Sequence, residues 1–286
     1  MIKKSQILFG LAALLPLASA QAISVTANNN ANDLVSAILG SGITVSGAPT
    51  YTGGALASGT FTGGLAAGIG IDSGILLTSG TATLAQGPNN SGSATGNNGL
   101  AGDASLNTLV SPGQQTHDAS SLTFNFSTAG GNLFFNFVFA SEEYNEYANT
   151  AYNDVFGFFL DGVNIALLPG TTTPVSINTV NGGNPLGTNA QHPEFYNNNP
   201  VNANLQYDGF TDVFTAQALN LSAGIHTIKL AIADTSDYIL DSGVFIQGGS
   251  FSENPTDPNP VPDGGSVTLV AVGAMMLANR FMRRRA

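Results

Sequence analysis

The sequence predicts an all-β protein built as a single large β-sandwich, jelly-roll-like, with one or two short helices. Short apolar runs separated by glycine-rich turns fill residues 21–251, a pattern typical of sandwiches. Several of these runs alternate apolar and polar residues with a period of two, which marks strands with one face in a core. Sandwiches of this length often form one unit, so we expect a single domain.

The N-terminal part of this domain predicts two short helices. Residues 32–42 space Leu34, Val35, Ile38 and Leu39 at helical intervals, and Gly40 follows where a left-handed cap belongs. A second helix is predicted to begin at Asp103, which suits an N-cap better than a metal ligand.

Strands are predicted from the remaining apolar runs. Phe124 and Phe126 share one face of their run, and Phe135, Phe137 and Phe139 share one face of the next. The run at 153–162 is apolar on both faces, which indicates an interior strand. An asparagine-rich stretch at 181–207 is predicted to be a long loop, functional or mobile. The predicted strands cover residues 43–47, 57–63, 74–80, 121–127, 132–140, 153–162, 225–234 and 242–251.

The first 20 residues have the pattern of a secretory signal peptide. Lys3 and Lys4 precede an apolar run, and residues 18–20 form a small-residue cleavage site ending at Ala20. The chain has no cysteine, which excludes disulfides, cysteine metal sites and lipid attachment to cysteine. An exported domain of this kind has to be stabilised by its core, its hydrogen bonds or a metal.

The C-terminal end predicts a sorting signal. Residues 252–265 form a proline-rich spacer, and residues 266–286 form a hydrophobic segment closed by arginines. This arrangement resembles the PEP-CTERM class of bacterial sorting signals, in its VPDGG variant. The resemblance implies recognition by an exosortase-type enzyme and transient membrane attachment; the alternative is a plain tail anchor. The residues expected to be recognised or cleaved are Val261, Pro262, Asp263, Gly264 and Gly265.

Charge is divided very unevenly along the chain. The net charge is −11, and Lys229 is the only lysine or arginine between Lys4 and Arg280. Such an acidic body would repel nucleic acid and anionic membranes, so nucleic acid is excluded as a partner. The acids of the body cannot be neutralised by internal ion pairs; they have to be solvated, protonated, used as caps or bound to cations.

Two predicted strands end with a carboxylate on the side of their apolar row. Glu143 continues the parity of Phe139, and Asp234 continues that of Ile232. Because a buried, unpaired carboxylate is costly, and because all the nearby donors are oxygens, we expect a Ca²⁺ site. The alternative is that these acids are solvated or cap turns, as Asp72, Asp161 and Asp208 are expected to do. The candidate ligands are Glu142, Glu143, Asp154, Asp234, Asp237 and Asp241.

Six segments carry a resemblance to a known family. They are GTFTGG (59–64), IGIDSGILLTSG (69–80), GDASLNTLV (102–110), HDASSLTFNF (117–126), FVFASEEYNEYANTAYNDVFGFFLDG (137–162) and ADTSDYILDSGVFIQGGSF (233–251). Together they resemble the choice-of-anchor L domain, found on bacterial surface and secreted proteins with varied C-terminal anchors. The resemblance implies location and fold, and it supplies no catalytic residue.

Two classes of function are open. An exported, acidic, calcium-stabilised sandwich suits adhesion or extracellular matrix, with an extracellular polysaccharide or a surface protein as partner. The alternative is a glycosidase that uses Glu142, Glu143 and Glu146, with Tyr144 and Tyr147 either stacking on sugar or packing at a rim. The three histidines are isolated and the chain has no GxSxG motif, so other hydrolase chemistry is not indicated. We expect a non-enzymatic protein.

Overall fold

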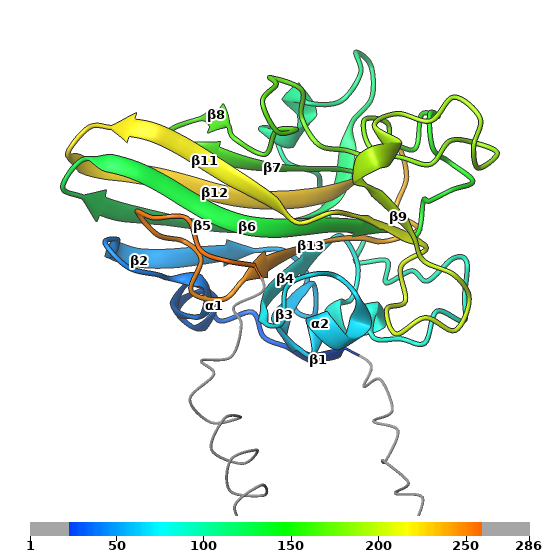
Figure 1. The fold of residues 1–286 in the computed structure, drawn as a ribbon, viewed down its shortest axis with the longest axis horizontal. Coiled ribbons are helices and arrows are strands. Elements are labelled where there is room, and N and C mark those ends of the chain that lie inside the picture. Colours follow the sequence, from blue (N-terminus) through cyan, green and yellow to red (C-terminus); the bar gives the residue numbers. More distant parts are fainter. Residues whose placement is uncertain (1–22, 259–286) are drawn as a thin grey trace, which may run out of the picture.

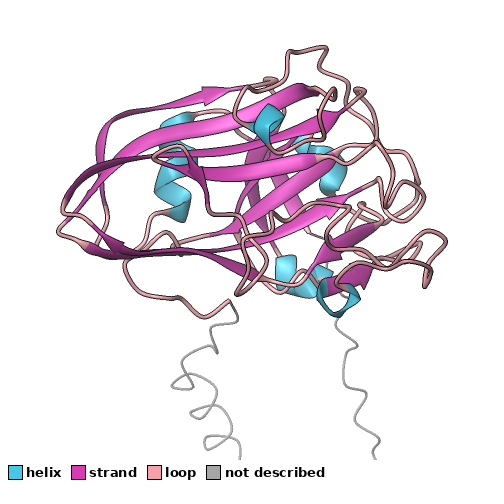
Figure 2. Cartoon of the chain, turned by 90° about the horizontal axis from the view of Figure 1, so that it is seen from above, coloured by secondary structure: helices cyan, strands magenta, loops and turns pink. Residues whose placement is uncertain are grey.

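The chain folds as two antiparallel β-sheets packed face to face (Figure 1). The computed structural model describes residues 23–258. The predicted β-sandwich is therefore confirmed, and short helices lie at its margins (Figure 2).

The larger sheet has eight strands, and its last strand in sequence lies in the middle. Strand β13 pairs with β4 on one side and with β6 on the other. The strand order is β1-β3-β4-β13-β6-β10-β9, and β11 pairs with the other part of β6. The strands are β1 (Ser24–Ala27), β3 (Ser58–Thr62), β4 (Gly74–Thr78), β6 (Gly131–Ser141), β9 (Tyr196–Asn198), β10 (Gly209–Thr211), β11 (Phe214–Leu221) and β13 (Ser242–Gln247).

The smaller sheet has five strands in the order β2-β5-β12-β7-β8. Strand β7 is buried along its whole length between β12 and β8, as its apolar sequence predicted. The strands are β2 (Thr44–Thr52), β5 (Thr116–Thr128), β7 (Val155–Leu160), β8 (Val163–Asn164) and β12 (Gly224–Thr235).

Phenylalanines from both sheets fill the space between them. Phe137 of β6 packs edge-on against Phe158 of β7 with ring centroids 5.0 Å apart, and Phe139 stacks on Phe156 at 4.9 Å. Each buried phenylalanine stabilises the fold by about 1.5–3 kcal/mol relative to an exposed one. Phe251, which follows β13, is fully buried in the same core. The alternating pattern of the sequence therefore produces the inner faces of the sandwich.

Helix α1 (Ala31–Ile38) confirms the first helix prediction, with Leu34, Val35 and Ile38 buried. The Asn30 side chain accepts a hydrogen bond from the Asn32 N–H and so caps the helix. The predicted left-handed cap at Gly40 is wrong, because the helix ends earlier and Leu39 at its C-cap is extended. Gly40 is needed for space instead: a Cβ there would lie 2.4 Å from the Gly249 carbonyl oxygen.

The helix predicted at Asp103 is a single 3₁₀ turn (Leu106–Thr108). The N-cap of this turn is Ser105 rather than the predicted Asp103, but Asp103 Oδ1 accepts hydrogen bonds from the N–H groups of Ser105 and Leu106. The sequence did not indicate helix α2 (Gly64–Ala67), which spans four residues between two left-handed glycines. Two further 3₁₀ turns occupy Ala82–Ala85 and Pro193–Phe195.

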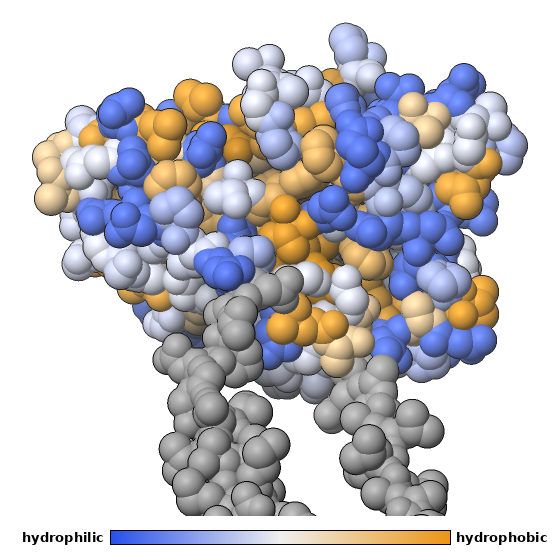
Figure 3. All heavy atoms as spheres, viewed as in Figure 1, coloured by the Kyte–Doolittle hydropathy of each residue, from blue (hydrophilic) through white to orange (hydrophobic). Residues whose placement is uncertain are grey.

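The asparagine-rich stretch at 181–207 consists mostly of loops and turns, as predicted, but a short part of it joins the larger sheet. It contains the 3₁₀ turn at Pro193–Phe195 and strand β9, which pairs with β10. In the space-filling view, the loops on the right of the molecule, which include this stretch, carry mostly hydrophilic residues (Figure 3).

Three connections between the two sheets meet at one end of the sandwich. Residues 79–115 join β4 to β5, residues 142–154 join β6 to β7, and residues 236–241 join β12 to β13. The register places Ser141 opposite Ser242 in one sheet and Thr116 opposite Thr235 in the other, so these strand ends are neighbours. We call this region the crossover end.

Within residues 23–258, no helix is long and apolar enough to cross a membrane. The predicted signal peptide and sorting signal, including Ala20, Val261, Pro262, Asp263, Gly264 and Gly265, lie outside the described residues.

Candidate functional site

The crossover end gathers five of the six candidate ligands in the protein interior. At most 2% of the surface of each of these residues is exposed. They lie on or beside the ends of β6, β7, β12 and β13, which the antiparallel register brings together. Asp237, the sixth candidate, is half-buried on the connection between β12 and β13. We call the following residues the acidic cluster: Glu142, Glu143, Asp154, Asp234 and Asp241.

Asp154 lies at the centre of the acidic cluster and joins the two sheets. Its Oδ1 accepts a hydrogen bond from the Thr235 N–H at 2.9 Å, and its Oδ2 accepts one from the Ser242 hydroxyl at 2.7 Å. Burial raises the pKa of Asp154 well above its usual range, although these two bonds oppose the shift. The charges of Asp237 and Asp241 raise this pKa further.

Asp241 is held by the backbone of the connection between β4 and β5. The Gly96 N–H donates to both carboxylate oxygens, at 2.8 and 3.0 Å, and the Thr81 N–H donates at 3.4 Å. Burial raises the pKa of Asp241 to about 6, against these hydrogen bonds. The carboxylate packs so closely on Gly80 that a Cβ at that position would collide with it.

Only one of the two carboxylate oxygens of Glu142 has a hydrogen-bond partner among the described residues. Its Oε2 accepts a hydrogen bond from the Ala94 N–H at 3.3 Å, whereas its buried Oε1 has no partner among the described residues. Burial raises the pKa of Glu142 to about 8, and the charge of Asp208 adds to the shift.

Glu143 and Asp234 carry the least satisfied oxygens of the acidic cluster. Glu143 Oε2 and both carboxylate oxygens of Asp234 are buried with no hydrogen-bond partner in the described structure. Burial raises the pKa of both groups, and the charge of Asp154 raises both further. An ionised carboxylate in this position is strongly destabilising unless a cation or a proton accompanies it.

The acidic cluster therefore offers two chemical states. Apart from Asp241, whose pKa is about 6, its carboxyls are protonated at neutral pH, or the cluster is ionised and balanced by a cation that no side chain among residues 23–258 supplies. The donors are all oxygens, which suits a hard cation such as Ca²⁺. As they stand, no three acidic or histidine side chains among residues 23–258 form a ready-made metal site. Backbone and hydroxyl oxygens would have to complete any coordination shell.

Two aspartates near the acidic cluster were not selected as site residues from the sequence. Asp118, buried and in a left-handed conformation, accepts hydrogen bonds from the N–H groups of Asn98 and Leu100. Asp208 was expected to cap a turn, but its carboxylate accepts a hydrogen bond from Asn89, which is distant in sequence, at 2.8 Å. In contrast, Asp161 does lie in the tight turn between β7 and β8, as predicted.

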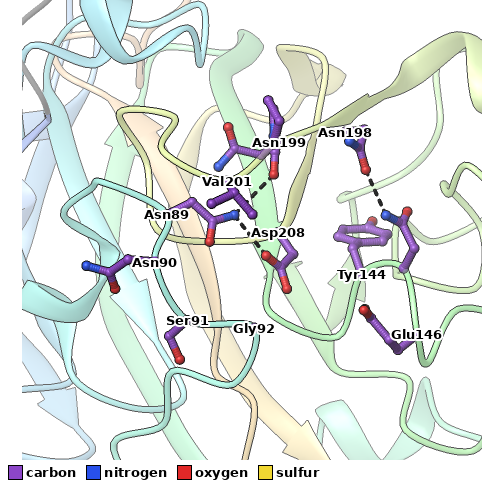
Figure 4. A pocket seen from close by; sticks show the side chains of 12 residues that line it. Asn89, Asn90, Ser91, Gly92, Tyr144, Glu146, Asn198, Asn199, Val201 and Asp208 are labelled. Atoms are coloured by element: carbon purple, nitrogen blue, oxygen red, sulfur yellow. Dashed lines mark hydrogen bonds between the residues drawn. The ribbon is translucent and has the colours of Figure 1, made fainter.

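A polar pocket of about 350 Å³ opens beside the acidic cluster (Figure 4). Three segments form its walls: residues 89–92, residues 144–146 and residues 198–201 together with Asp208. Burial raises the pKa of Asp208, the hydrogen bond from Asn89 opposes this, and the charge of Glu146 adds to it. Both side chains line this pocket.

The two tyrosines after the acidic run have different environments. Tyr144 is fully buried, and its hydroxyl donates to the Val180 carbonyl at 2.7 Å. It is therefore neither a stacking platform for sugar nor a rim residue. Tyr147 is 37% exposed and packs edge-on against Tyr152, as expected of a residue at a rim.

Comparison with known proteins identifies the family. The Choice-of-anchor L domain family matches residues 23–252, which is nearly all of the described sandwich. The chain belongs to this family. Its choice-of-anchor L domain matches neither a curated protein nor a solved structure. Membership of the family implies an exported, surface-anchored protein.

Proposed function

We propose that this choice-of-anchor L domain is a non-enzymatic protein of the cell surface that binds Ca²⁺ in its acidic cluster and acts in adhesion or in the extracellular matrix. The observation behind the calcium proposal is the set of buried, unpartnered oxygens on Glu142, Glu143 and Asp234. Because the described chain carries one lysine and no arginine, the balancing charge has to come from outside.

The ion would be held where the two sheets meet. Asp154 and Asp234 lie at ends of strands in the smaller sheet, and Glu142, Glu143 and Asp241 lie at ends of strands in the larger one. Bound Ca²⁺ would remove the repulsion between these carboxylates and cross-link both sheets. An exported domain without disulfides gains stability in this way. Asp237 is placed to contribute from the rim.

Adhesion or matrix assembly is supported by location. The family implies a surface-anchored protein, and the predicted signal peptide and PEP-CTERM-like tail imply export and processing by an exosortase-type enzyme. An extracellular polysaccharide or a surface protein is the proposed partner. The strong negative charge of the domain argues against nucleic acid.

Burial argues against a glycosidase that uses Glu142 or Glu143. A glycosidase needs two carboxyl groups that reach the same scissile bond. Glu142 and Glu143 are each only 1% exposed, so of the three glutamates suggested by the sequence only Glu146 is accessible to a substrate.

Thermal unfolding of the purified full chain with CaCl₂ or with EDTA tests the calcium proposal. At a free Ca²⁺ concentration of about 100 times the Kd, binding should add about 2.7 kcal/mol, which raises the Tm by several degrees. Asp234→Asn should remove most of this increase. The matched control is Asp72→Asn, an exposed carboxylate outside the acidic cluster, which should keep it. Equal Tm values in CaCl₂ and EDTA would refute calcium binding.

A hydrolase assay on neutral polysaccharides tests the non-enzymatic part. The purified chain should release no reducing ends. If it does release them, and if Glu146→Gln abolishes the release without lowering the Tm, the glycosidase alternative is correct.

A further inference from the structure

The polar pocket beside the acidic cluster has the chemistry of a carbohydrate site, and we infer that it binds a neutral sugar unit of an extracellular polysaccharide. This inference rests on the proposed function, because it assigns the polysaccharide partner to a place on the domain. The residues that carry it are Asn89, Asn90, Gly92, Glu146, Asn198 and Asp208.

One wall of the pocket presents a fixed carboxylate. Buried Asn89 donates from its side-chain amide to Asp208 Oδ1 at 2.8 Å and to the Asn199 carbonyl at 3.1 Å (Figure 4). This leaves Asp208 Oδ2 on the side of Gly92, where a Cβ would lie 3.7 Å from it. A ligand would therefore meet an acceptor whose position is already set, which lowers the entropic cost of binding.

The opposite wall is fixed by a second amide. Asn145 donates to Asn198 Oδ1 at 2.7 Å and accepts from the Tyr196 hydroxyl at 2.5 Å. This arrangement positions the next residue, Glu146, whose exposed side chain points into the same opening as Asp208 (Figure 4). The two carboxylates thus face a ligand from two sides.

The lining combines polar side chains with apolar surface from Pro200 and Val201, which suits a ligand that carries hydroxyl groups on a carbon ring. Carboxylates accept hydrogen bonds and amides both donate and accept, whereas a sugar hydroxyl can do either. An apolar ligand would leave these groups unpaired, which is costly, and an anionic sugar would be repelled by Asp208 and Glu146. The volume of about 350 Å³ lies within the ~300–1,000 Å³ of small-molecule sites. A neutral monosaccharide unit satisfies all of these conditions.

The pocket is also coupled to the acidic cluster through the backbone. Glu142 and Glu143 directly precede the segment that carries Glu146, and the Asp208 N–H donates to the Ser141 carbonyl at 3.1 Å. Glu142 further accepts from Ala94, two residues beyond Gly92. Calcium in the acidic cluster would therefore fix two walls of the pocket, and sugar binding should be stronger in CaCl₂ than in EDTA.

Affinity electrophoresis of the purified full chain tests this inference. The gels contain a neutral glucan, a neutral galactomannan or, as an anionic comparison, alginate, each with CaCl₂ or EDTA. We expect retardation by at least one neutral polysaccharide and none by alginate. Asp208→Asn and Glu146→Gln should each weaken binding about tenfold or more, because each removes a charged hydrogen-bond acceptor.

Two further variants separate binding from folding. Asp212→Asn is the matched control, because Asp212 also accepts a hydrogen bond from an asparagine, Asn197, at 2.8 Å but lies outside the pocket. It should bind as the parent does. Asn90→Ala changes an exposed pocket residue, so it should keep the Tm and still lose affinity.

The outcomes distinguish this inference from the calcium proposal. No retardation by any neutral polysaccharide, or equal loss in Asp208→Asn and Asp212→Asn, would overturn the sugar site even if calcium raises the Tm. If retardation is the same in EDTA and CaCl₂, and if the Tm is also the same in both, the sugar site is supported and calcium binding is refuted.

Discussion

The carboxylates of this domain have two contrasting environments, one with basic partners and one without. Two of the aspartates outside the acidic cluster pair with basic side chains: Asp103 with Lys229, and Asp161 with His226 at 2.7 Å. The acidic cluster, in contrast, is buried without a lysine, an arginine or a histidine bonded to any of its carboxylates in the described structure. Its hydrogen bonds come from backbone N–H groups and serine hydroxyls.

The pKa values follow this division. Burial alone would raise the pKa of Asp103 and Asp161, but hydrogen bonds from Lys229 and His226 lower it below the usual range. In the acidic cluster, burial dominates and every pKa is raised. The paired aspartates are thus stable as anions, whereas the acidic cluster needs protons or an added cation.

The largest expected effect is a pH dependence of opposite sign in the two regions. Groups whose pKa is raised in the folded state stabilise it below their unfolded pKa, near 4, and lose this contribution as the pH rises through the folded value. For Asp241 and Glu142 these folded values are about 6 and about 8. In EDTA, the free energy of unfolding should therefore fall by a few kcal/mol between pH 5 and pH 9, at about 1.4 kcal/mol per pKa unit.

Urea unfolding at several pH values, in EDTA and in CaCl₂, measures this dependence. Calcium binds the ionised carboxylates and should offset the loss at high pH. Asp103 and Asp161 act in the other direction, because their contribution is present above pH ~4 and disappears as the pH falls through their lowered pKa. A metal-free domain equally stable at pH 5 and pH 9 would contradict the assignment of buried, unbalanced carboxyls.

A glycine substitution tests how closely the acidic cluster is packed. Gly80→Ala places a methyl group against the Asp241 carboxylate and should cost about 1–3 kcal/mol, as expected for overpacking. Gly92→Ala, on the same connection, has its nearest contact at 3.7 Å and should change the free energy of unfolding by less than about 0.5 kcal/mol. Chemical denaturation of both variants measures the difference, and equal values would mean that Asp241 is free to move.

The smallest effect is expected at the pair formed by Asp161 and His226. The hydrogen bond that His226 donates to Asp161, and next the one that it donates to the Ser222 carbonyl, raise the pKa of His226. Its charge therefore stabilises the fold below pH ~6.5 and stops doing so as the pH rises through the raised value. Because the Asp161 side chain is 51% exposed, His226→Gln should cost only about 0.5 kcal/mol more at pH 5.5 than at pH 8.5. In a chain that already carries Asp161→Asn, His226→Gln should cost the same at pH 5.5 and at pH 8.5.

Much of the fold could be predicted from the sequence because burial on one face leaves a clear period-two pattern. Strands β5 and β12 alternate large apolar and smaller or polar residues over much of their length, whereas β6 and β13 are buried at consecutive positions and stand out as apolar runs. Strand β11 lacks this pattern beyond Phe214 and Ala216, and β9 is three residues long in a polar stretch. Such edge strands are defined by their partners rather than by their own composition.

The site could be predicted only in part, for a related reason. Strand parity indicated that Glu143 and Asp234 would be buried, and both are. It could not indicate the N–H donors at Ala94 and Gly96, because backbone groups leave no signal in the sequence. Asp208 resembled an ordinary turn residue, since its partner Asn89 is 119 positions away.

The central position of β13 determines how the domain would bear a mechanical load. The chain leaves through residues 248–258, directly after a strand that is hydrogen-bonded to β4 on one side and β6 on the other. A pull on the tail would have to shear both ladders at once and extract the Phe251 ring from the core. An edge strand would instead peel away one hydrogen bond at a time. The predicted C-terminal anchor would therefore pull on a strand that is hydrogen-bonded along both of its edges.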